Sequence, residues 1–140
     1  MSSFKGFTLI ELLVVVAVIG ILASVGVLSY NGYVSGTKRK SAENMMMAIG
    51  LAQTSFYSNY NEYYDMDGTV NDCDPDEDTN KLIGKNLFES EKYIKDDLGF
   101  NFCIYGTDTD TANPGYIIVA TGQSCKLTMD QNGNLEKEGC

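Results

Sequence analysis

Glu11 is the one charged side chain in a long apolar segment near the start of the chain. Residues 12–37 carry no charge, and a helix of that length can cross a bilayer core of about 30 Å. A charged side chain at membrane depth costs about 2.5–3.5 kcal/mol, so Glu11 is expected to have a function and a partner. The neighbouring sequence offers no partner, except the amine that a cut before Phe7 would create.

The cysteines are the other residues whose type suggests chemistry: Cys73, Cys103, Cys125 and Cys140. The chain has no histidine and no Cys-x-x-Cys pair, which disfavours a zinc site because such sites use closely spaced ligands. Without histidine, a serine or cysteine nucleophile also lacks its usual base, so no catalytic residue and no enzyme activity are predicted. Two disulfides in an oxidising compartment fit these cysteines better.

The dipeptide Asn132-Gly133 is the strongest hairpin signal in the chain. A two-residue turn at this point sets a register in which Cys125 falls opposite Cys140. Opposed residues of an antiparallel pair have Cα atoms about 4.5–5.5 Å apart, a distance that suits a disulfide. We therefore expect a bond between Cys125 and Cys140, which leaves Cys73 to pair with Cys103.

The elements that must position these residues follow from hydrophobic periodicity. Residues 7–60 predict one long helix, which is apolar all round in its first half, residues 7–30, and amphipathic in its second half. An acidic loop follows, and then a short helix or turn near residues 86–95. Strands are predicted at 100–105, 116–121, 125–129 and 135–138. This order indicates an α+β fold, in which the long N-terminal helix packs on a small antiparallel sheet.

The second half of the predicted helix has apolar residues at spacings of three and four, which is typical of a core-facing stripe. The stripe consists of Ala42, Met45, Met46, Ile49, Ala52, Phe56 and Tyr60. Polar residues such as Glu43 and Gln53 are expected to lie off this buried face. The basic run Lys38-Arg39-Lys40 has three interpretations: the end of a lipid-facing segment, a set of partners for acidic groups on neighbouring molecules, or a solvated helix face.

The acidic segment after the helix contains oxygen ligands of the kind that calcium takes, namely Asp65, Asp67, Asp72, Asp74, Asp76, Glu77 and Asp78. Their spacing is not that of an EF-hand, and the segment is interpreted as a solvated loop. No metal and no other cofactor is predicted. The formal charge of the chain is −9, and a surface of this sign repels a phosphate backbone, so direct nucleic-acid binding by the C-terminal part is not expected.

The segment KGFTLIE followed by LLVVVAVIGILASVGVLSY resembles the N-terminus of type IV prepilins and of the related pseudopilins of type II secretion. The resemblance implies a leader peptide, residues 1–6, that a prepilin peptidase removes by cutting after Gly6, followed by N-methylation of Phe7. It also implies that Glu11 pairs with the Phe7 amine of a neighbouring subunit. Residues 61–140 would form a globular head, in which a C-terminal disulfide is common for the family. One departure is Leu28, where such pilins usually have a proline that kinks the helix.

The resemblance implies a structural subunit of a type IV pilus, a homopolymer that grows through its N-terminal helix into a surface filament for adhesion, motility or DNA uptake. Its partners would be identical subunits, minor pilins and the prepilin peptidase. The chain would cross the inner membrane once before assembly and belong to an extracellular filament afterwards. The alternative within the superfamily is a type II secretion pseudopilin.

Three other interpretations of the N-terminal segment remain open. A secretory signal peptide cut near Ala23-Ser24 would place Glu11 inside an apolar core that normally avoids charge. A plain membrane anchor leaves Glu11 without a role. A membrane-attached enzyme that uses a pilin-like export segment would show turnover independent of assembly.

Overall fold

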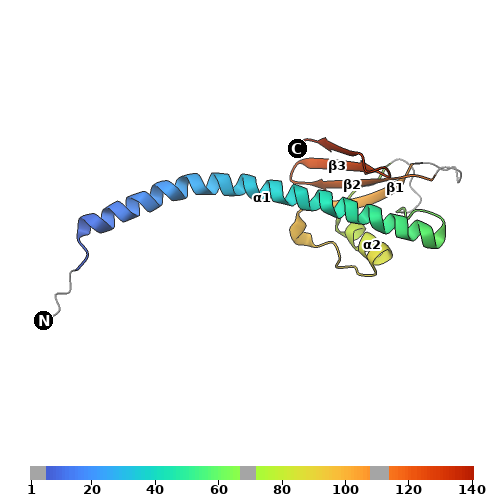
Figure 1. Ribbon diagram of the computed structural model, residues 1–140, viewed down its shortest axis with the longest axis horizontal. Coiled ribbons are helices and arrows are strands. Elements are labelled where there is room, and N and C mark those ends of the chain that lie inside the picture. Colours follow the sequence, from blue (N-terminus) through green and yellow to red (C-terminus); the bar gives the residue numbers. More distant parts are fainter. Residues whose placement is uncertain (1–5, 67–71, 108–113) are drawn as a thin grey trace. The chain divides into compact units, whose positions relative to one another are not determined.

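The computed structural model describes residues 6–66, 72–107 and 114–140. The elements follow in the order α1 (Leu9–Tyr60), α2 (Glu77–Phe88), the short 3-10 helix η1 (Asp96–Leu98) and four strands (Figure 1). The chain divides into two compact units, Met1–Thr37 and Lys38–Cys140, here called the apolar unit and the head unit. Helix α1 contributes its first part to the apolar unit and its second part to the head unit.

The apolar unit leaves its large hydrophobic side chains open on all sides of the helix. Those between Phe7 and Tyr33 are 50–83% exposed. By length and composition α1 is able to cross a membrane. The helix continues without interruption through Gly20, Gly26 and Leu28. Leucine keeps the main-chain N–H that a proline would lack, so residue 28 introduces no break.

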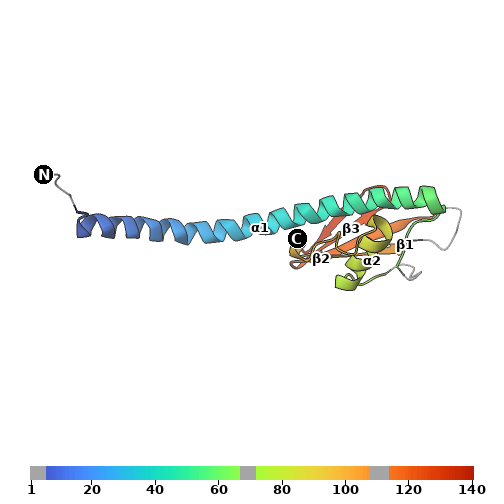
Figure 2. The same ribbon diagram turned by 90° about the horizontal axis from the view of Figure 1, so that it is seen from below.

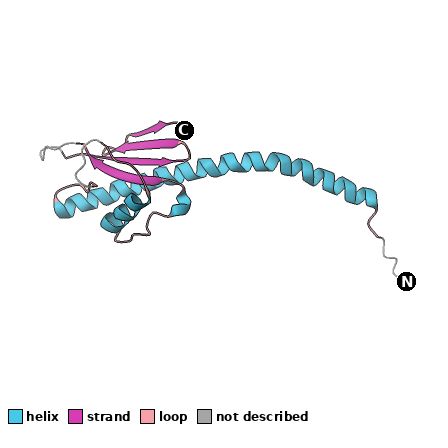
Figure 3. Ribbon diagram, turned by 180° about the vertical axis from the view of Figure 1, so that it is seen from behind, coloured by secondary structure: helices cyan, strands magenta, loops and turns pink. Residues whose placement is uncertain are grey.

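The head unit contains one antiparallel sheet of four strands in the order β1-β2-β3-β4 (Figure 3). The strands are β1 (Asn101–Gly106), β2 (Tyr116–Gly122), β3 (Cys125–Asp130) and β4 (Leu135–Glu138). Each differs from its predicted range by at most one residue at either end. The expected α+β fold, a long N-terminal helix with a small antiparallel sheet, is confirmed.

The core of the head unit lies between α1 and one face of the sheet. Ala42, Met46 and Ile49 of α1 are fully buried, as the apolar stripe predicts. In the sheet, two cross-strand rows belong to the same buried cluster, Phe102–Ala120–Leu127 and Ile104–Ile118–Met129. Strand β3 alternates between buried and more exposed residues, because successive side chains of a strand point to opposite faces.

Helix α2 begins earlier than the sequence predicted: within the range 86–95, expected to form a short helix or turn, residues 86–88 are the end of α2 and residues 91–92 form a turn. Asp76 caps α2: its Oδ1 accepts the main-chain N–H of Thr79 at 2.7 Å, and Thr79 Oγ1 accepts that of Asp76 at 2.9 Å. This reciprocal capping box, with acidic residues in the first turn, starts a helix inside the predicted acidic loop. The helix ends at Phe88, where Glu89 is left-handed.

Helix α2 packs beside β1 and covers the outer edge of that strand (Figure 2). Asn80 Oδ1 accepts the N–H of Phe102 at 2.8 Å, and Thr79 Oγ1 donates to the Phe102 carbonyl oxygen at 2.6 Å. The N–H of Met66 donates to the Ile104 carbonyl oxygen at 3.2 Å. Side chains and loop backbone thus take the place of a fifth strand, which protects an edge that would otherwise offer free hydrogen-bonding groups.

The β3–β4 hairpin has a register one residue away from the predicted one, so the expected two-residue turn is wrong. Met129 pairs with Leu135, and the loop is three residues long. The Asp130 carboxylate accepts the N–H groups of Asn132 and Asn134, each at 2.9 Å, and Gly133 N–H donates to the Asp130 carbonyl oxygen at 3.0 Å. Gly133 has φ 82°, the left-handed residue that a three-residue loop requires.

Candidate functional site

Glu11 has a partner in Thr8, the residue just before α1, which corrects the expectation that only a new amine could serve. Glu11 Oε2 accepts the main-chain N–H of Thr8 at 2.9 Å and the Thr8 hydroxyl at 2.7 Å. The Glu11 N–H in turn donates to Thr8 Oγ1 at 3.3 Å. This is the reciprocal arrangement of a capping box, Thr-x-x-Glu. The sequence carries that signal in Thr8-Leu9-Ile10-Glu11.

The two residues predicted to flank a processing point, Gly6 and Phe7, lie just before α1. Residues 6–8 have no regular secondary structure, and the first helical bond runs from Leu12 N–H to the Thr8 carbonyl oxygen at 3.3 Å. Phe7 is 83% exposed, and a Cβ added at Gly6 would have no atom within 4 Å. The bond between Gly6 and Phe7 is therefore accessible and outside the helix. The other leader residues, 1–5, lie outside the described residues.

The cysteines form two disulfides in the expected pairing. Cys73 bonds to Cys103 with a Cα–Cα distance of 6.1 Å, and Cys125 bonds to Cys140 with a Cα–Cα distance of 4.6 Å. In the observed register the residue after Glu138, Gly139, would face Cys125. Gly139 has φ 71°, a left-handed conformation that turns the chain after β4. This turn lets Cys140 reach Cys125 despite the shifted register.

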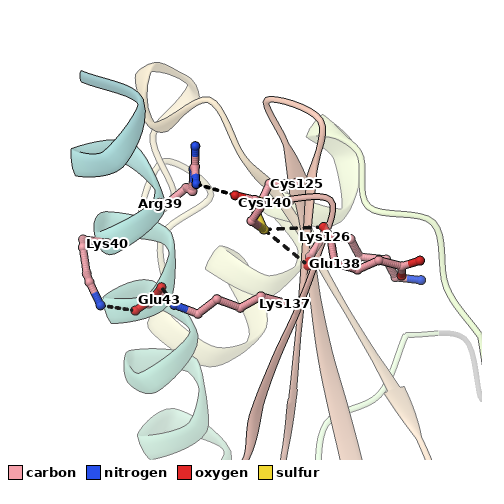
Figure 4. A network of polar contacts seen from close by, with 8 residues as sticks. All are labelled: Arg39, Lys40, Glu43, Cys125, Lys126, Lys137, Glu138 and Cys140. Carbon is pink, nitrogen blue, oxygen red and sulfur yellow. Dashed lines mark hydrogen bonds and ion pairs between the residues drawn. A yellow bond between two sulfur atoms is a disulfide. The ribbon is translucent and has the colours of Figure 1, made fainter. Parts of the chain in front are cut away.

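The basic run on α1 makes contacts within the head unit (Figure 4). Arg39 Nη1 donates to the terminal main-chain oxygen of Cys140 at 3.0 Å. Lys40 Nζ and Lys137 Nζ contact the two carboxylate oxygens of Glu43 at 2.8 and 2.6 Å. The sequence did not predict the last of these, because Lys137 is far from α1 along the chain. Arg39 thus contacts the C-terminal segment directly, and Lys40 shares the Glu43 carboxylate with Lys137 of the hairpin.

Glu43 is the buried centre of this polar network, although it was expected to lie off the buried face. It is only 7% exposed. Hydrogen bonds from Lys137 and then Lys40 lower the pKa of its carboxyl group below the usual range, against the opposing effect of burial. A helical spacing of three from Lys40 to Glu43 was the one local sign of a pair.

The described part of the acidic segment shows no metal site. Within residues 6–66, 72–107 and 114–140, no three metal-binding side chains of the kind His, Cys, Asp or Glu come together. Asp76 instead caps α2, and Asp78 pairs with Lys81 at 2.9 Å. Of the candidate calcium ligands, Asp67 lies outside the described residues.

Comparison with known proteins finds similarity in the N-terminal part of the chain. Residues 1–27 match the family described as the prokaryotic N-terminal methylation motif. The type IV major pilin protein PilA of Myxococcus xanthus is 41% identical over 61 residues, 44% of this chain and 28% of that one. The type IV major fimbrial protein FimA of Dichelobacter nodosus is 51% identical over 47 residues, 34% of this chain and 28% of that one.

A third relative, the fimbrial protein EcpC of Eikenella corrodens, is 43% identical over 54 residues, 39% of this chain and 35% of that one. The chain therefore spans about a third or less of the length of these relatives. No solved structure matches the chain. All three relatives are pilus or fimbrial proteins rather than enzymes. The methylation motif and the similarity to major pilins cover the N-terminal segment of the chain, and the long helix with its four-stranded sheet agrees with the fold expected from the resemblance to type IV pilins.

Proposed function

We propose that this chain is a structural subunit that polymerises through its apolar helix into a type IV pilus. The observation that carries the proposal is the exposure of the apolar unit, whose large hydrophobic side chains between Phe7 and Tyr33 are 50–83% exposed. A helix that is hydrophobic all round requires a membrane or a bundle of other helices around it. The same helix would serve both stages, first in the inner membrane and then in the core of an extracellular filament.

Processing by a prepilin peptidase would convert the membrane form into the assembling form. The cut would fall between Gly6 and Phe7, and Phe7 would be N-methylated. The motif match over residues 1–27 and the non-helical position of this bond support the step. Removal of Lys5 with the leader would change the formal charge from −9 to −10.

Glu11 would direct assembly by pairing with the Phe7 amine of a neighbouring subunit. Both bonds from Thr8 end on Oε2, and Oε1 accepts none from the described part of the chain. This leaves one carboxylate oxygen for a second donor. An unpaired carboxylate among apolar helices is costly, so a neighbour's amine would favour one stagger between subunits over others.

Similarity to major pilins supports the pilus over the alternative, a pseudopilin of type II secretion. Partners would be identical subunits and minor pilins. Adhesion, motility and DNA uptake are the roles that such a filament would serve, with no direct contact between the acidic head unit and nucleic acid.

Mass spectrometry of the mature protein tests the processing step. We expect a chain that begins at N-methyl-Phe7. A mature N-terminus near Ser24 would instead show that the segment is a secretory signal peptide.

Substitution of Glu11 tests assembly. Glu11→Val should leave folded, membrane-inserted protein but few fibres in electron micrographs of sheared surface material. Glu62→Val removes an exposed carboxylate from the head unit and is the matched control, which should assemble normally. Normal fibre numbers in Glu11→Val would refute the role of Glu11.

A further inference from the structure

We propose that Thr8 is a positioning residue for leader cleavage. It caps the N-terminus of α1, which begins at Leu9, and so keeps the Gly6–Phe7 bond outside the helix. This inference rests on the proposed processing step. It assigns to the capping box a role before cleavage, whereas the proposed pairing of Glu11 with a neighbour's amine belongs to assembly.

The hydrogen bonds between Thr8 and Glu11 define the residue at which α1 begins. Thr8 N–H is bonded to Glu11 Oε2 at 2.9 Å, and the Glu11 N–H is bonded to Thr8 Oγ1 at 3.3 Å. A helix leaves its first N–H groups without partners inside the helix, and these two bonds satisfy two of them. Phe7, one residue earlier, has no regular secondary structure and is 83% exposed.

In a membrane, the N-terminus of α1 needs such a cap. In lipid, a main-chain N–H without a partner is costly, and the simplest remedy is to lengthen the helix by another turn. Extension beyond Thr8 would place the Phe7 and Gly6 carbonyl oxygens in helical hydrogen bonds. Gly6 opposes this only weakly, because glycine disfavours a helix by about 1 kcal/mol. The capping box supplies the missing partners and removes the reason for extension.

A peptide bond inside a helix is a poor substrate for a peptidase. Its carbonyl oxygen and the neighbouring N–H groups are already bonded to the helix, and enzymes that bind peptides through their main chain need those groups free. Gly6 adds access, because a Cβ at that position would have no atom within 4 Å. Thr8 would therefore set the cleavage rate without touching the scissile bond.

Two substitutions separate this role from the assembly role of Glu11. Glu11→Gln keeps the cap, because glutamine also completes a capping box, but it removes the charge that an amine would pair with. Thr8→Val keeps the charge but removes the hydroxyl. Thr8→Ser and Thr8→Asn restore a good N-cap residue with two different side chains.

The experiment measures the initial rate of leader removal by purified prepilin peptidase acting on the full chain in detergent, together with amide hydrogen exchange at Ile10, whose N–H would donate to the Gly6 carbonyl oxygen in an extended helix. We expect Thr8→Val to be cleaved about fivefold more slowly, since a lost cap costs about 1 kcal/mol. Its Ile10 amide should become protected, while Thr8→Ser and Thr8→Asn return both readouts towards those of the unaltered chain. Glu11→Gln, which retains a capping-box side chain, should keep an Ile10 amide as unprotected as in the unaltered chain and yet form few fibres.

The outcomes distinguish the inference from the proposed function. Cleavage of Thr8→Val at the unaltered rate, with an Ile10 amide no more protected than in the unaltered chain, overturns the role of Thr8 and leaves the pilus proposal intact. Absence of cleavage after Gly6 in the unaltered chain overturns the proposed processing and the inference with it. Unchanged thermal unfolding of the head unit in every variant excludes a general folding defect.

Discussion

Gln53 and Asn80 are buried polar side chains of the head unit that bond to particular main-chain groups. Gln53 is fully buried, and it accepts the N–H of Tyr64 at 2.8 Å and donates to the Tyr64 carbonyl oxygen at 2.6 Å. This pair of bonds joins the chain after α1 back to the helix. Asn80, 3% exposed, accepts the N–H of Phe102 and donates to the side-chain oxygen of Asn101, which connects α2 to β1. Such side chains act as substitutes for strand partners.

Asn80→Ala should destabilise the protein by about 1–3 kcal/mol, because it leaves the buried N–H of Phe102 without its acceptor. Chemical denaturation of the full chain in detergent measures this loss. Asn86→Ala is the matched control on the exposed side of the same helix, and its effect should stay within about 0.5 kcal/mol. Equal losses for the two variants would contradict the role given to Asn80.

Glu43 should make the stability of the head unit depend on pH in the acidic range. Its folded-state pKa is lowered, first by Lys137 and then by Lys40, from an ordinary value of 4.5. A depressed carboxyl pKa contributes stability that is fully present above the unfolded-state pKa and is lost as pH falls through the folded-state pKa. Stability should therefore decrease as the pH falls below about 4.5.

Thermal unfolding between neutral pH and about pH 3 tests this prediction by comparison with Glu43→Gln, which should lose part of the acid dependence. Glu136→Gln, an exposed change on β4, serves as the control and should keep the full slope. An identical slope in Glu43→Gln and the unaltered chain would show that Glu43 does not contribute.

At the scale of elements, the C-terminal hairpin is held by contacts from both ends. The three-residue loop with left-handed Gly133 sets its register, and the disulfide from Cys125 closes its open end. Arg39 and the Glu43–Lys137 pair then connect the hairpin to α1. Strand β4 is mostly exposed, so these connections, rather than core burial, keep it in place.

Removal of the C-terminal disulfide by Cys125→Ser with Cys140→Ser should destabilise the head unit by about 3 kcal/mol, the loop-entropy value for a separation of 15 residues. The matched pair Cys73→Ser with Cys103→Ser, at a separation of 30, should cost about 3.6 kcal/mol. Denaturant unfolding gives both values. Non-reducing peptide mapping of the unaltered chain should link Cys125 to Cys140, and a link from Cys103 to Cys125 would contradict the observed pairing.

At the scale of the whole molecule, the two units differ in the exposure of their hydrophobic side chains. The apolar unit exposes its hydrophobic side chains, and the head unit buries its own cluster from both α1 and the sheet. The boundary falls at Lys38, inside α1. The second part of the helix is therefore an integral part of the head unit, in contrast to a head that begins only after the helix.

A fragment of residues 38–140 should fold and remain soluble without detergent, because it retains the buried cluster and both disulfides. Circular dichroism and a cooperative thermal transition measure this. A shorter fragment, residues 47–140, lacks Ala42, Glu43 and Met46 and should be much less stable. A longer fragment that is as poorly folded as the shorter one would contradict the independence of the head unit.

The sequence by itself determined the features that depend on local pattern. The uncharged run after Glu11 specified an apolar helix, and alternating residues and turn signals located all four strands. The pilin resemblance came from a short contiguous motif, which needs no tertiary information. The sequence also carries the capping signal of α2 in Asp76 and Thr79, although the density of acidic residues around them is typical of a loop.

Only the tertiary structure decided the features that depend on residues distant along the chain. Lys137 pairs with the buried carboxylate of Glu43, and the N–H of Phe102 donates to the buried side chain of Asn80. No local pattern links either pair. The hairpin register was decided by the packing of Met129 and Leu135 and by the bonds of Asp130, which together outweighed the preference of Asn132-Gly133 for a two-residue turn. Periodicity shows which face of an element is apolar, whereas the partner of a buried polar group is set by which elements meet.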